Sequence, residues 1–472
     1  MTLALCAGHP FAARAQELTL ERIYGNGDLS AESFDGRWMA DGNGWAMVER
    51  TEDGATELWR VEAASGARTP LVRAAELVPP GGGEPIEIEE FAFSPDGRML
   101  LLFTDAQQVW RARTKGTYYT FDLEGRTLRP LSEREGWQMF AKFSPDGGRV
   151  AFVRDHDLWM TDLATGRERR LTSDGSETII NGTTDWVYEE ELGLRDAFRW
   201  SPDGTRIAYW RFDQSPVREF YLLDQTSLYP EPIPIRYPKV GTANSLVRVG
   251  SFDLASGETT WFDLPCHRAP AAGGEECYIA RMEWLGADQV VIQRLNRHQN
   301  RLELLAGHAA TGAVETILVE EDAAWVDVND DLTWIDEGRR FIWTSERDGW
   351  NHLYLYERDG TLVRQLTQGE WEVSEVAGVD DERDRVYFTA ARNGPLGRSV
   401  LSVDLRGRVA PVFEGERGWH DVELAPGFRY AVLTRSTVEE PPVSVLARLR
   451  GAETATVRVL VDNAALRARL DS

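Results

Sequence analysis

The sequence has 472 residues, of which 42% are hydrophobic and 17 are tryptophan, and this is enough apolar material for a large packed core. Its 77 acidic and 52 basic residues give a formal charge of −25, which excludes nucleic acids and anionic membrane surfaces as partners, because phosphate binding requires clustered Lys and Arg. No apolar run reaches the roughly 18 residues of a membrane-spanning helix, and no Cys and His spacing is typical of zinc, so we expect no membrane span, no metal and no cofactor.

The first segment of the chain, residues 1–17, reads MTLALCAGHPFAARAQE. An apolar stretch from Leu3 to Ala7 precedes the small–x–small pattern Ala13-Arg14-Ala15, as at the end of a secretory signal peptide whose basic start is missing. We therefore predict a truncated signal peptide and a periplasmic or secreted protein. A disordered terminus is the alternative.

A Ser-Pro-Asp-Gly motif with an aromatic residue before it and an apolar run after it occurs three times. The copies are FAFSPDGRMLLLF from Phe91, AKFSPDGGRVAFV from Ala141 and FRWSPDGTRIAYW from Phe198. Proline fixes φ, Asp-Gly favours a tight turn, and the flanking residues favour strands, so each copy predicts a β-hairpin.

Weaker copies of this hairpin extend the pattern to both ends of the chain. They are GRWMADGNGWAMVER before the clear copies, and MEWLGADQVVIQRL, LTWIDEGRRFIWTS, VAGVDDERDRVYFTA and VELAPGFRYAVLT after them. Four short strands in each period of about 40 to 60 residues are typical of a propeller blade. The sequence thus predicts an all-β, eight-bladed β-propeller over residues 18–460, with seven blades as the alternative, and a short helix capped by Asp462 in residues 461–472.

Two insertions interrupt the repeats, and the first contains TTDWVYEEELG at residues 183–193. We expect a helical turn here with Asp185 as its N-cap. The adjacent side chains of Glu189, Glu190 and Glu191 fan out by about 100° per residue, so two of them can converge on one small cation. A primary ammonium, with three donors and no acceptor, suits such a site.

The aromatic neighbours of these glutamates, Trp186 and Tyr188, are expected to form apolar walls beside them. Two alternatives remain open from the residues alone. The charge run can simply be solvated, since exposed charges contribute little to stability. It can also bind calcium, although it lacks the spaced Asp, Asn and Gly ligands of a dedicated loop.

The second insertion, from Gln214 to Ser245, is rich in Pro and Tyr and is expected to form an extended arm. After it, Cys266 and Cys277 are close enough in sequence to form a loop disulfide in an oxidising compartment, or to remain free thiols.

Several stretches together resemble the N-terminal propeller domain of the dipeptidyl peptidase IV family, bacterial type. They are NGTTDWVYEEELG, WSPDGTRIAYWRFDQSPV, SLYPEPIPIRYPKVGTANSLV, GEWEV and VLVDNAALRARL, and the resemblance is collinear from Leu18 to the end of the chain. Members of this family are serine peptidases of the prolyl oligopeptidase clan that remove N-terminal dipeptides. The resemblance implies that peptides with a free N-terminus bind here and that the arm mediates a homodimer.

The resemblance also implies roles for individual residues. Glu190 and Glu191 match the glutamates that bind the substrate's α-ammonium, and Glu189 matches a supporting residue. Arg111, in VWRARTKGTYYTFDL, matches an arginine on a strand of the second blade near the carbonyl of the first substrate residue. An ion pair between Arg111 and the glutamates is the alternative, and the two roles are compatible.

The chain departs from the family pattern in two places. Where some relatives have an aromatic residue and an arginine at the outer S2 region, WVDVNDD supplies Asn329 and Asp330. No G-x-S-x-G motif marks a serine nucleophile. We therefore expect the gating propeller of a peptidase that releases X-Pro or X-Ala dipeptides, with its α/β-hydrolase domain truncated or separately encoded. A stand-alone binding or scaffold propeller is the alternative.

Overall fold

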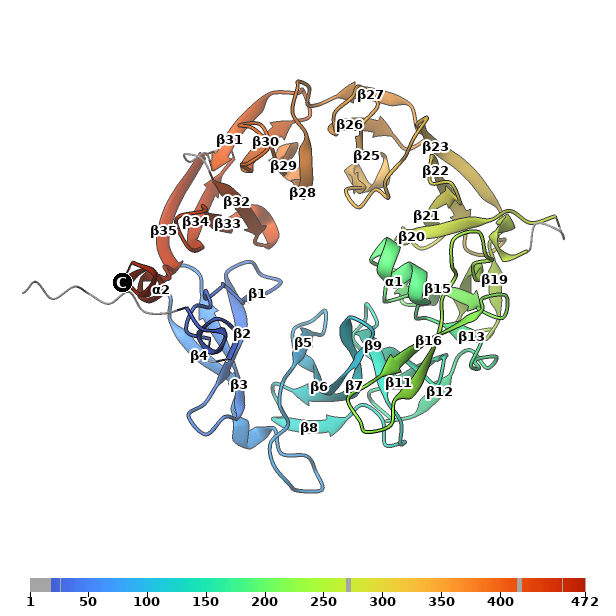
Figure 1. Cartoon of the computed structure of the whole chain (residues 1–472), viewed down its shortest axis with the longest axis horizontal. Helices are drawn as coiled ribbons and strands as arrows, with labels where there is room; N and C mark the ends of the chain where they lie inside the picture. The colour runs from blue at the N-terminus through green and yellow to red at the C-terminus, as the bar shows by residue number, and fades with distance from the viewer. Residues whose placement is uncertain (1–17, 26, 269–272, 414–417, 452, 472) are drawn as a thin grey trace, which may run out of the picture.

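The computed structural model describes residues 18–25, 27–268, 273–413, 418–451 and 453–471. The predicted signal peptide, residues 1–17, lies outside these described residues. Figure 1 shows antiparallel sheets that follow one another around a ring in chain order. The all-β prediction is confirmed. In the described residues, no helix combines the length and apolar character needed to cross a membrane.

The first half of the chain forms a four-stranded sheet, an eight-stranded sheet, a five-stranded sheet and a separate hairpin. The four-stranded sheet contains β1 (Arg37–Trp38), β2 (Gly44–Arg50), β3 (Thr56–Glu62) and β4 (Arg68–Val72). The eight-stranded sheet contains β5 (Glu90–Phe93), β6 (Met99–Val109), β7 (Ala112–Asp122), β8 (Thr127–Pro130), β9 (Gln138–Phe143), β10 (Arg149–Arg154), β11 (Asp157–Asp162) and β12 (Glu168–Arg170). The five-stranded sheet contains β13 (Ile179–Asn181), β14 (Phe198–Trp200), β15 (Arg206–Asp213), β18 (Leu246–Asp253) and β19 (Thr259–Trp261), and the hairpin contains β16 (Glu219–Asp224) and β17 (Glu231–Arg236).

The second half of the chain forms four further sheets of four strands each. They are β20 (Cys277–Leu285), β21 (Gln289–Asn296), β22 (Arg301–His308) and β23 (Val314–Glu321); β24 (Thr333–Ile335), β25 (Arg340–Ser345), β26 (His352–Glu357) and β27 (Leu362–Gln365); β28 (Val373–Asp380), β29 (Arg385–Ala390), β30 (Ser399–Asp404) and β31 (Val409–Phe413); and β32 (Trp419–Leu424), β33 (Tyr430–Ser436), β34 (Val443–Arg450) and β35 (Glu453–Val461). The described helices are η1 (Glu21–Gly25), η2 (Ala74–Glu76), α1 (Trp186–Leu192), η3 (Pro265–His267), η5 (Asp336–Gly338), η6 (Asp381–Arg383), η7 (Pro426–Phe428) and α2 (Ala464–Leu470).

The predicted hairpins are all present. The three Ser-Pro-Asp-Gly motifs connect β5 to β6, β9 to β10 and β14 to β15. In each turn the serine carbonyl accepts a hydrogen bond from the glycine amide, and the glycine has a positive φ that other residues rarely adopt. The weaker copies form β1–β2, β20–β21, β24–β25, β28–β29 and β32–β33. Each of the eight predicted repeats therefore begins with a hairpin.

Neighbouring sheets pack face to face through shared buried clusters. One cluster joins the first sheet to the last, and it includes Trp45 and Val61 from one side and Tyr430 and Leu446 from the other. Other clusters join the remaining neighbours in turn. Apolar contact thus runs around the whole ring, which gives a rigid frame for the insertions.

Three local features differ from the expected pattern. The hairpin of β6 and β7 is longer than the parts that pair with β5 and β8, so that Lys115 and Gly116 pair with β9 and two repeats merge into one sheet. The glutamate insertion splits the innermost strand of its sheet into β13 and β14, which both pair with β15. At the final helix, Asn463 rather than Asp462 is the N-cap, although Asp462 Oδ1 still accepts a hydrogen bond from the Ala464 amide.

Candidate functional site

Helix α1 lies on the inner side of the ring, within the insertion between β13 and β14 (Figure 1). The base of the insertion is closed by a bridge between Thr183 and Asp196, and Thr184 Oγ1 donates a hydrogen bond to the Leu194 carbonyl at 2.7 Å. Gly193 ends the helix in the left-handed conformation, with φ 62°. The chain around α1 is therefore fixed at both ends.

Asp185 is the N-cap of α1, as the sequence predicted. Its Oδ1 accepts a hydrogen bond from the Tyr188 amide at 3.0 Å, and its Oδ2 accepts one from Ser245 Oγ at 2.5 Å. Burial raises the pKa of the Asp185 carboxyl, while these hydrogen bonds oppose the shift. The cap thus joins the start of α1 to the residue that precedes β18.

We expect Asp185→Ala to lower the free energy of unfolding by about 1–2 kcal/mol, because the helix loses its cap and Ser245 Oγ loses its acceptor. A urea titration measures this change. The control, Ser245→Ala, keeps the capping bond and should cost less. Equal losses for the two variants would contradict the capping role.

The three glutamates of α1 point to different surroundings. Glu189 is buried, and its Oε1 lies 3.2 Å from Arg195 Nε. Glu190 has 13% of its side chain exposed and pairs with Arg111, whose Nε lies 2.7 Å from Oε1 and 2.5 Å from Oε2. Glu191 is exposed and has no hydrogen bond or ion pair with any side chain that the structure describes. Glu189 is therefore buried and paired with Arg195, Glu190 is mostly buried and paired with Arg111, and Glu191 is exposed and unpaired among the described residues.

Arg111 lies in the turn between β6 and β7, and this corrects the prediction that it lies on a strand. Val109 pairs with Ala112, so Trp110 and Arg111 are the two residues of the turn, and Trp110 has the positive φ, 49°, that such hairpin turns favour. The Arg111 side chain is 74% exposed. Its pKa is raised first by the hydrogen bond to Glu190 and then by the charge of that carboxylate. The β6–β7 hairpin thus places the guanidinium group of Arg111 next to Glu190 of α1.

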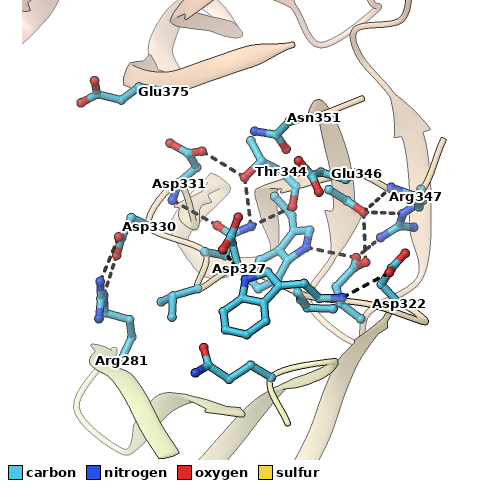
Figure 2. Close-up of a pocket in the computed structure, with 18 of the residues that line it drawn as sticks. Arg281, Asp322, Asp327, Asp330, Asp331, Thr344, Glu346, Arg347, Asn351 and Glu375 are labelled. Atoms are coloured by element: carbon cyan, nitrogen blue, oxygen red, sulfur yellow. Dashed lines mark hydrogen bonds and ion pairs between the residues drawn. The ribbon is translucent and has the colours of Figure 1, made fainter. Parts of the chain in front are cut away.

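A cavity of about 750 Å³ opens beside the C-terminal end of α1 and is strongly acidic (Figure 2). Nine carboxylates and three guanidinium groups line it. The carboxylates belong to Glu191, Glu320, Glu321, Asp322, Asp327, Asp330, Asp331, Glu346 and Glu375. Burial, followed by neighbouring carboxylates, raises the pKa of both Glu346 and Glu375. A cation that enters this cavity therefore meets a favourable field.

Asn329 and Asp330, the residues that depart from the family pattern, both line this cavity. Asn329 is buried and donates hydrogen bonds to Thr344 at its carbonyl, 2.8 Å, and at its hydroxyl, 3.0 Å. Asp330 faces Arg281, with 2.5 Å between Oδ1 and Nε (Figure 2). This wall of the cavity is therefore polar, and its polar side chains are hydrogen-bonded or ion-paired with one another.

Neither Trp186 nor Tyr188 lines this cavity. Tyr188 is buried in the core between sheets, and burial raises its pKa well above the ordinary value. Trp186 packs edge-on against Tyr237, with ring centroids 4.4 Å apart. Both aromatic side chains therefore help to anchor the helix.

Comparison with known proteins identifies the family of this chain. A family model described as the dipeptidyl peptidase IV (DPP IV) N-terminal region matches residues 94–442, well over half of the chain. The chain belongs to this family. It is 30% identical to a probable dipeptidyl peptidase 4 of Arthroderma benhamiae over 82% of this chain and 49% of that protein. It is 29% identical to a probable dipeptidyl-aminopeptidase B of Emericella nidulans over 90% of this chain and 50% of that protein.

Among solved structures, the chain is similar to Porphyromonas gingivalis dipeptidyl peptidase 4, with a TM-score of 0.86 and 31% identity over 96% of this chain and 63% of that chain. A putative dipeptidyl aminopeptidase IV of Bacteroides ovatus shares the fold, with a TM-score of 0.73 and 22% identity over 93% of this chain and 61% of that one. The chain spans about half the length of the two fungal relatives that it matches.

The chain contains one disulfide bond among its described residues, between Cys266 and Cys277. The sequence alone had left open whether these two cysteines are joined.

Proposed function

We propose that this chain is the substrate-gating domain of a serine-type dipeptidyl peptidase that releases N-terminal X-Pro or X-Ala dipeptides. Glu190 and Glu191 bind the α-ammonium of the substrate, Arg111 orients the carbonyl of its first residue, and Glu189 and Asp185 hold the helix in place. The peptide bond is cleaved by a partner α/β-hydrolase domain that carries the serine nucleophile.

The observation that carries this proposal is the open Glu191 carboxylate, one residue from the Arg111–Glu190 pair and at the edge of an acidic cavity. A primary ammonium has three N–H donors, so it can satisfy Glu191 and the free lone pairs of Glu190 together. A peptide without a free amino group leaves these carboxylates unmatched. The site therefore selects chain ends over internal segments.

The test compares a short peptide that begins Ala-Pro with its N-acetylated form, titrated into the chain by calorimetry at pH 7. We expect the free-amino peptide to bind at least about tenfold more tightly, because acetylation removes the charge that the glutamates recognise. Raising the pH above about 8, the usual pKa of an α-amino group, should weaken the free peptide alone. Equal affinities would contradict the proposal and favour a stand-alone scaffold propeller.

We also propose eight blades, formed by residues 18–460, with residues 461–472 beginning the linker to the hydrolase domain. The count takes β5–β8 and β9–β12 as separate blades, although they share one sheet, and takes the sheet split by α1 as one blade. The eight hairpin repeats and the clusters that join every pair of neighbours support it. The Cys266–Cys277 disulfide supports a periplasmic or secreted location, where such bonds persist.

We propose in addition that the arm from Gln214 to Ser245 forms a homodimer interface. At the tip of its β16–β17 hairpin, Leu228 is 90% exposed and Tyr229 is 80% exposed, and large apolar side chains gathered on a surface mark interaction sites.

The variant Leu228→Asp/Tyr229→Asp should shift the chain from dimer to monomer in sedimentation velocity, because dimerisation would bury two unpaired charges in each subunit. The control is Val438→Asp, at an apolar side chain that is also fully exposed but lies between β33 and β34. It should leave the sedimentation unchanged. A wild-type chain that sediments as a monomer would refute the interface.

A further inference from the structure

Tyr188 attaches the glutamate helix to the next sheet by a hydrogen bond. Its ring is 3% exposed and packs edge-on against Phe212, with centroids 4.7 Å apart. Its hydroxyl accepts a hydrogen bond from the Ile279 amide at 2.8 Å. Because Tyr188 immediately precedes the three glutamates, its contact with Ile279 helps to fix the position of their helix.

Ile279 belongs to β20, which is an edge strand of its sheet. The backbone groups on the outer side of an edge strand have no strand partner and must be satisfied in another way. Here the Ile279 amide bonds to Tyr188, and the Ile279 carbonyl accepts a hydrogen bond from Trp210 Nε1 of β15 at 2.8 Å. The contact therefore joins the sheet that carries α1 to the sheet that follows it.

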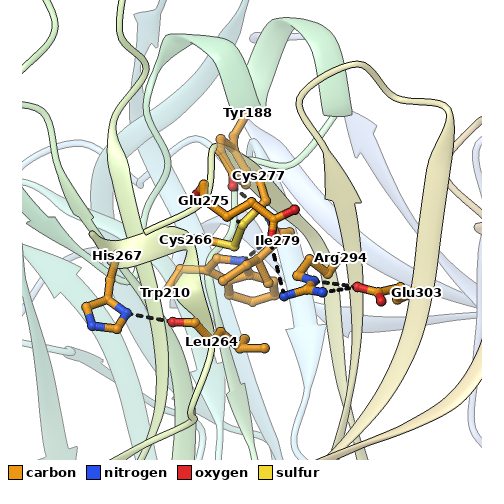
Figure 3. The surroundings of a disulfide bond; sticks show 10 residues. All are labelled: Tyr188, Trp210, Leu264, Cys266, His267, Glu275, Cys277, Ile279, Arg294 and Glu303. Carbon is orange, nitrogen blue, oxygen red and sulfur yellow. Dashed lines mark hydrogen bonds and ion pairs between the residues drawn. A yellow bond between two sulfur atoms is a disulfide. The ribbon is translucent and has the colours of Figure 1, made fainter. Parts of the chain in front are cut away.

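The disulfide spans the same junction (Figure 3). Cys277 is the first residue of β20, two positions before Ile279, and Cys266 lies in η3, directly after the last strand of the sheet that carries α1. Their Cα atoms are 5.3 Å apart, and both cysteines are buried. A covalent bond thus ties the start of β20 to η3, which follows the neighbouring sheet, beside the Tyr188–Ile279 contact.

We infer that the Cys266–Cys277 disulfide is a positioning element for the glutamate pair. It holds the first residues of β20 against the sheet that carries α1, so that the Ile279 amide stays within reach of Tyr188 and the two carboxylates keep their places. Small displacements of charged groups weaken binding strongly because the geometry of the contacts is lost. The consequence for peptide binding rests on the proposed function, whereas the positioning itself requires no ligand.

The experiment compares the chain with Cys266→Ala/Cys277→Ala and with Tyr188→Phe, which keeps the ring and removes the hydroxyl. Hydrogen exchange followed by mass spectrometry, on peptides that cover residues 186–192 and 278–285, should show faster exchange in both variants. Calorimetry with the free-amino peptide should show binding weakened about three- to tenfold. A variant that combines all three substitutions should bind the peptide no more weakly than the weaker-binding of the two separate variants, because both sets of substitutions disrupt the same Tyr188–Ile279 contact.

The matched control is Tyr387→Phe. Tyr387 is also buried, and its hydroxyl donates to the Gly451 carbonyl at 3.0 Å between two sheets remote from α1. This control should lower the unfolding temperature without changing exchange in residues 186–192. A cysteine variant that behaves like the control, with lower stability and unchanged exchange at α1, overturns the inference.

The two proposals can fail separately. If the wild-type chain binds no peptide, the proposed function fails, and the exchange data still decide whether the disulfide positions the helix. If the cysteine variant does not fold, the wild-type chain treated with a phosphine reductant takes its place in the exchange measurement. Unchanged exchange at α1 after complete reduction then overturns the inference.

Discussion

Replacing the two glutamates proposed to bind the ammonium, as Glu190→Gln/Glu191→Gln, should weaken binding of a free-amino peptide at least about 100-fold. The amides keep the shape of the side chains and remove two negative charges, so the substrate ammonium loses its counter-charges. Loss of one partner from a desolvated, hydrogen-bonded charge pair typically costs about 2–5 kcal/mol, and about 2.7 kcal/mol corresponds to 100-fold. Calorimetry with the Ala-Pro peptide measures the change.

The same variant also removes the ion pair of Arg111. Its guanidinium pairs with Glu190 alone among the described residues, so the substitution leaves it without a carboxylate partner. Because the Arg111 side chain is largely exposed, the stability of the fold should hardly change.

The control for this experiment is Glu52→Gln/Glu258→Gln, which makes the same change of charge at two exposed glutamates outside α1, one between β2 and β3 and one between β18 and β19. It should retain wild-type affinity. If the control weakens binding as much as the double variant in α1, the effect arises from the net charge of the protein. If the α1 variant binds normally, the assignment of Glu190 and Glu191 is wrong.

Features encoded by a few neighbouring residues could be predicted from the sequence. The turns at Ser94, Ser144 and Ser201 follow from Pro-Asp-Gly, whose conformational preferences act within four residues. The cap of α1 at Asp185 follows from the preference of a short carboxylate for free backbone amides. The repeats could therefore be located along the chain without knowledge of how the sheets pack.

Features that depend on which surfaces meet could not be predicted. Tyr188 points into the core because its hydroxyl bonds to the Ile279 amide of β20 and its ring packs against Phe212. Neither Ile279 nor Phe212 is close to Tyr188 in the sequence. Arg111 occupies a turn because β6 and β7 are eleven residues long each. The alternation of apolar and polar residues in the sequence did not reveal this length. The pairing of Asp330 with Arg281 likewise joins segments 49 residues apart.

The largest effect on stability is expected at Trp210. It lies in the middle of β15, is fully buried, and packs in the core cluster that joins three neighbouring sheets. Truncating a buried aromatic side chain to alanine typically costs about 3–5 kcal/mol, since apolar contacts are lost and a cavity remains. Trp210→Ala also leaves the Ile279 carbonyl without its donor.

A urea titration should therefore show Trp210→Ala destabilised by about 3–5 kcal/mol or more, while Trp210→Phe, which keeps most of the apolar volume, should lose clearly less. The comparison separates packing from hydrogen bonding, because both variants remove the indole N–H that bonds to Ile279 and only the alanine variant empties the core. A loss below about 1 kcal/mol for the alanine variant would mean that the sheets do not depend on this junction. Since the same Ile279 also holds Tyr188, the phenylalanine variant should disturb the glutamate helix even where the fold survives, and hydrogen exchange in residues 186–192 detects that disturbance.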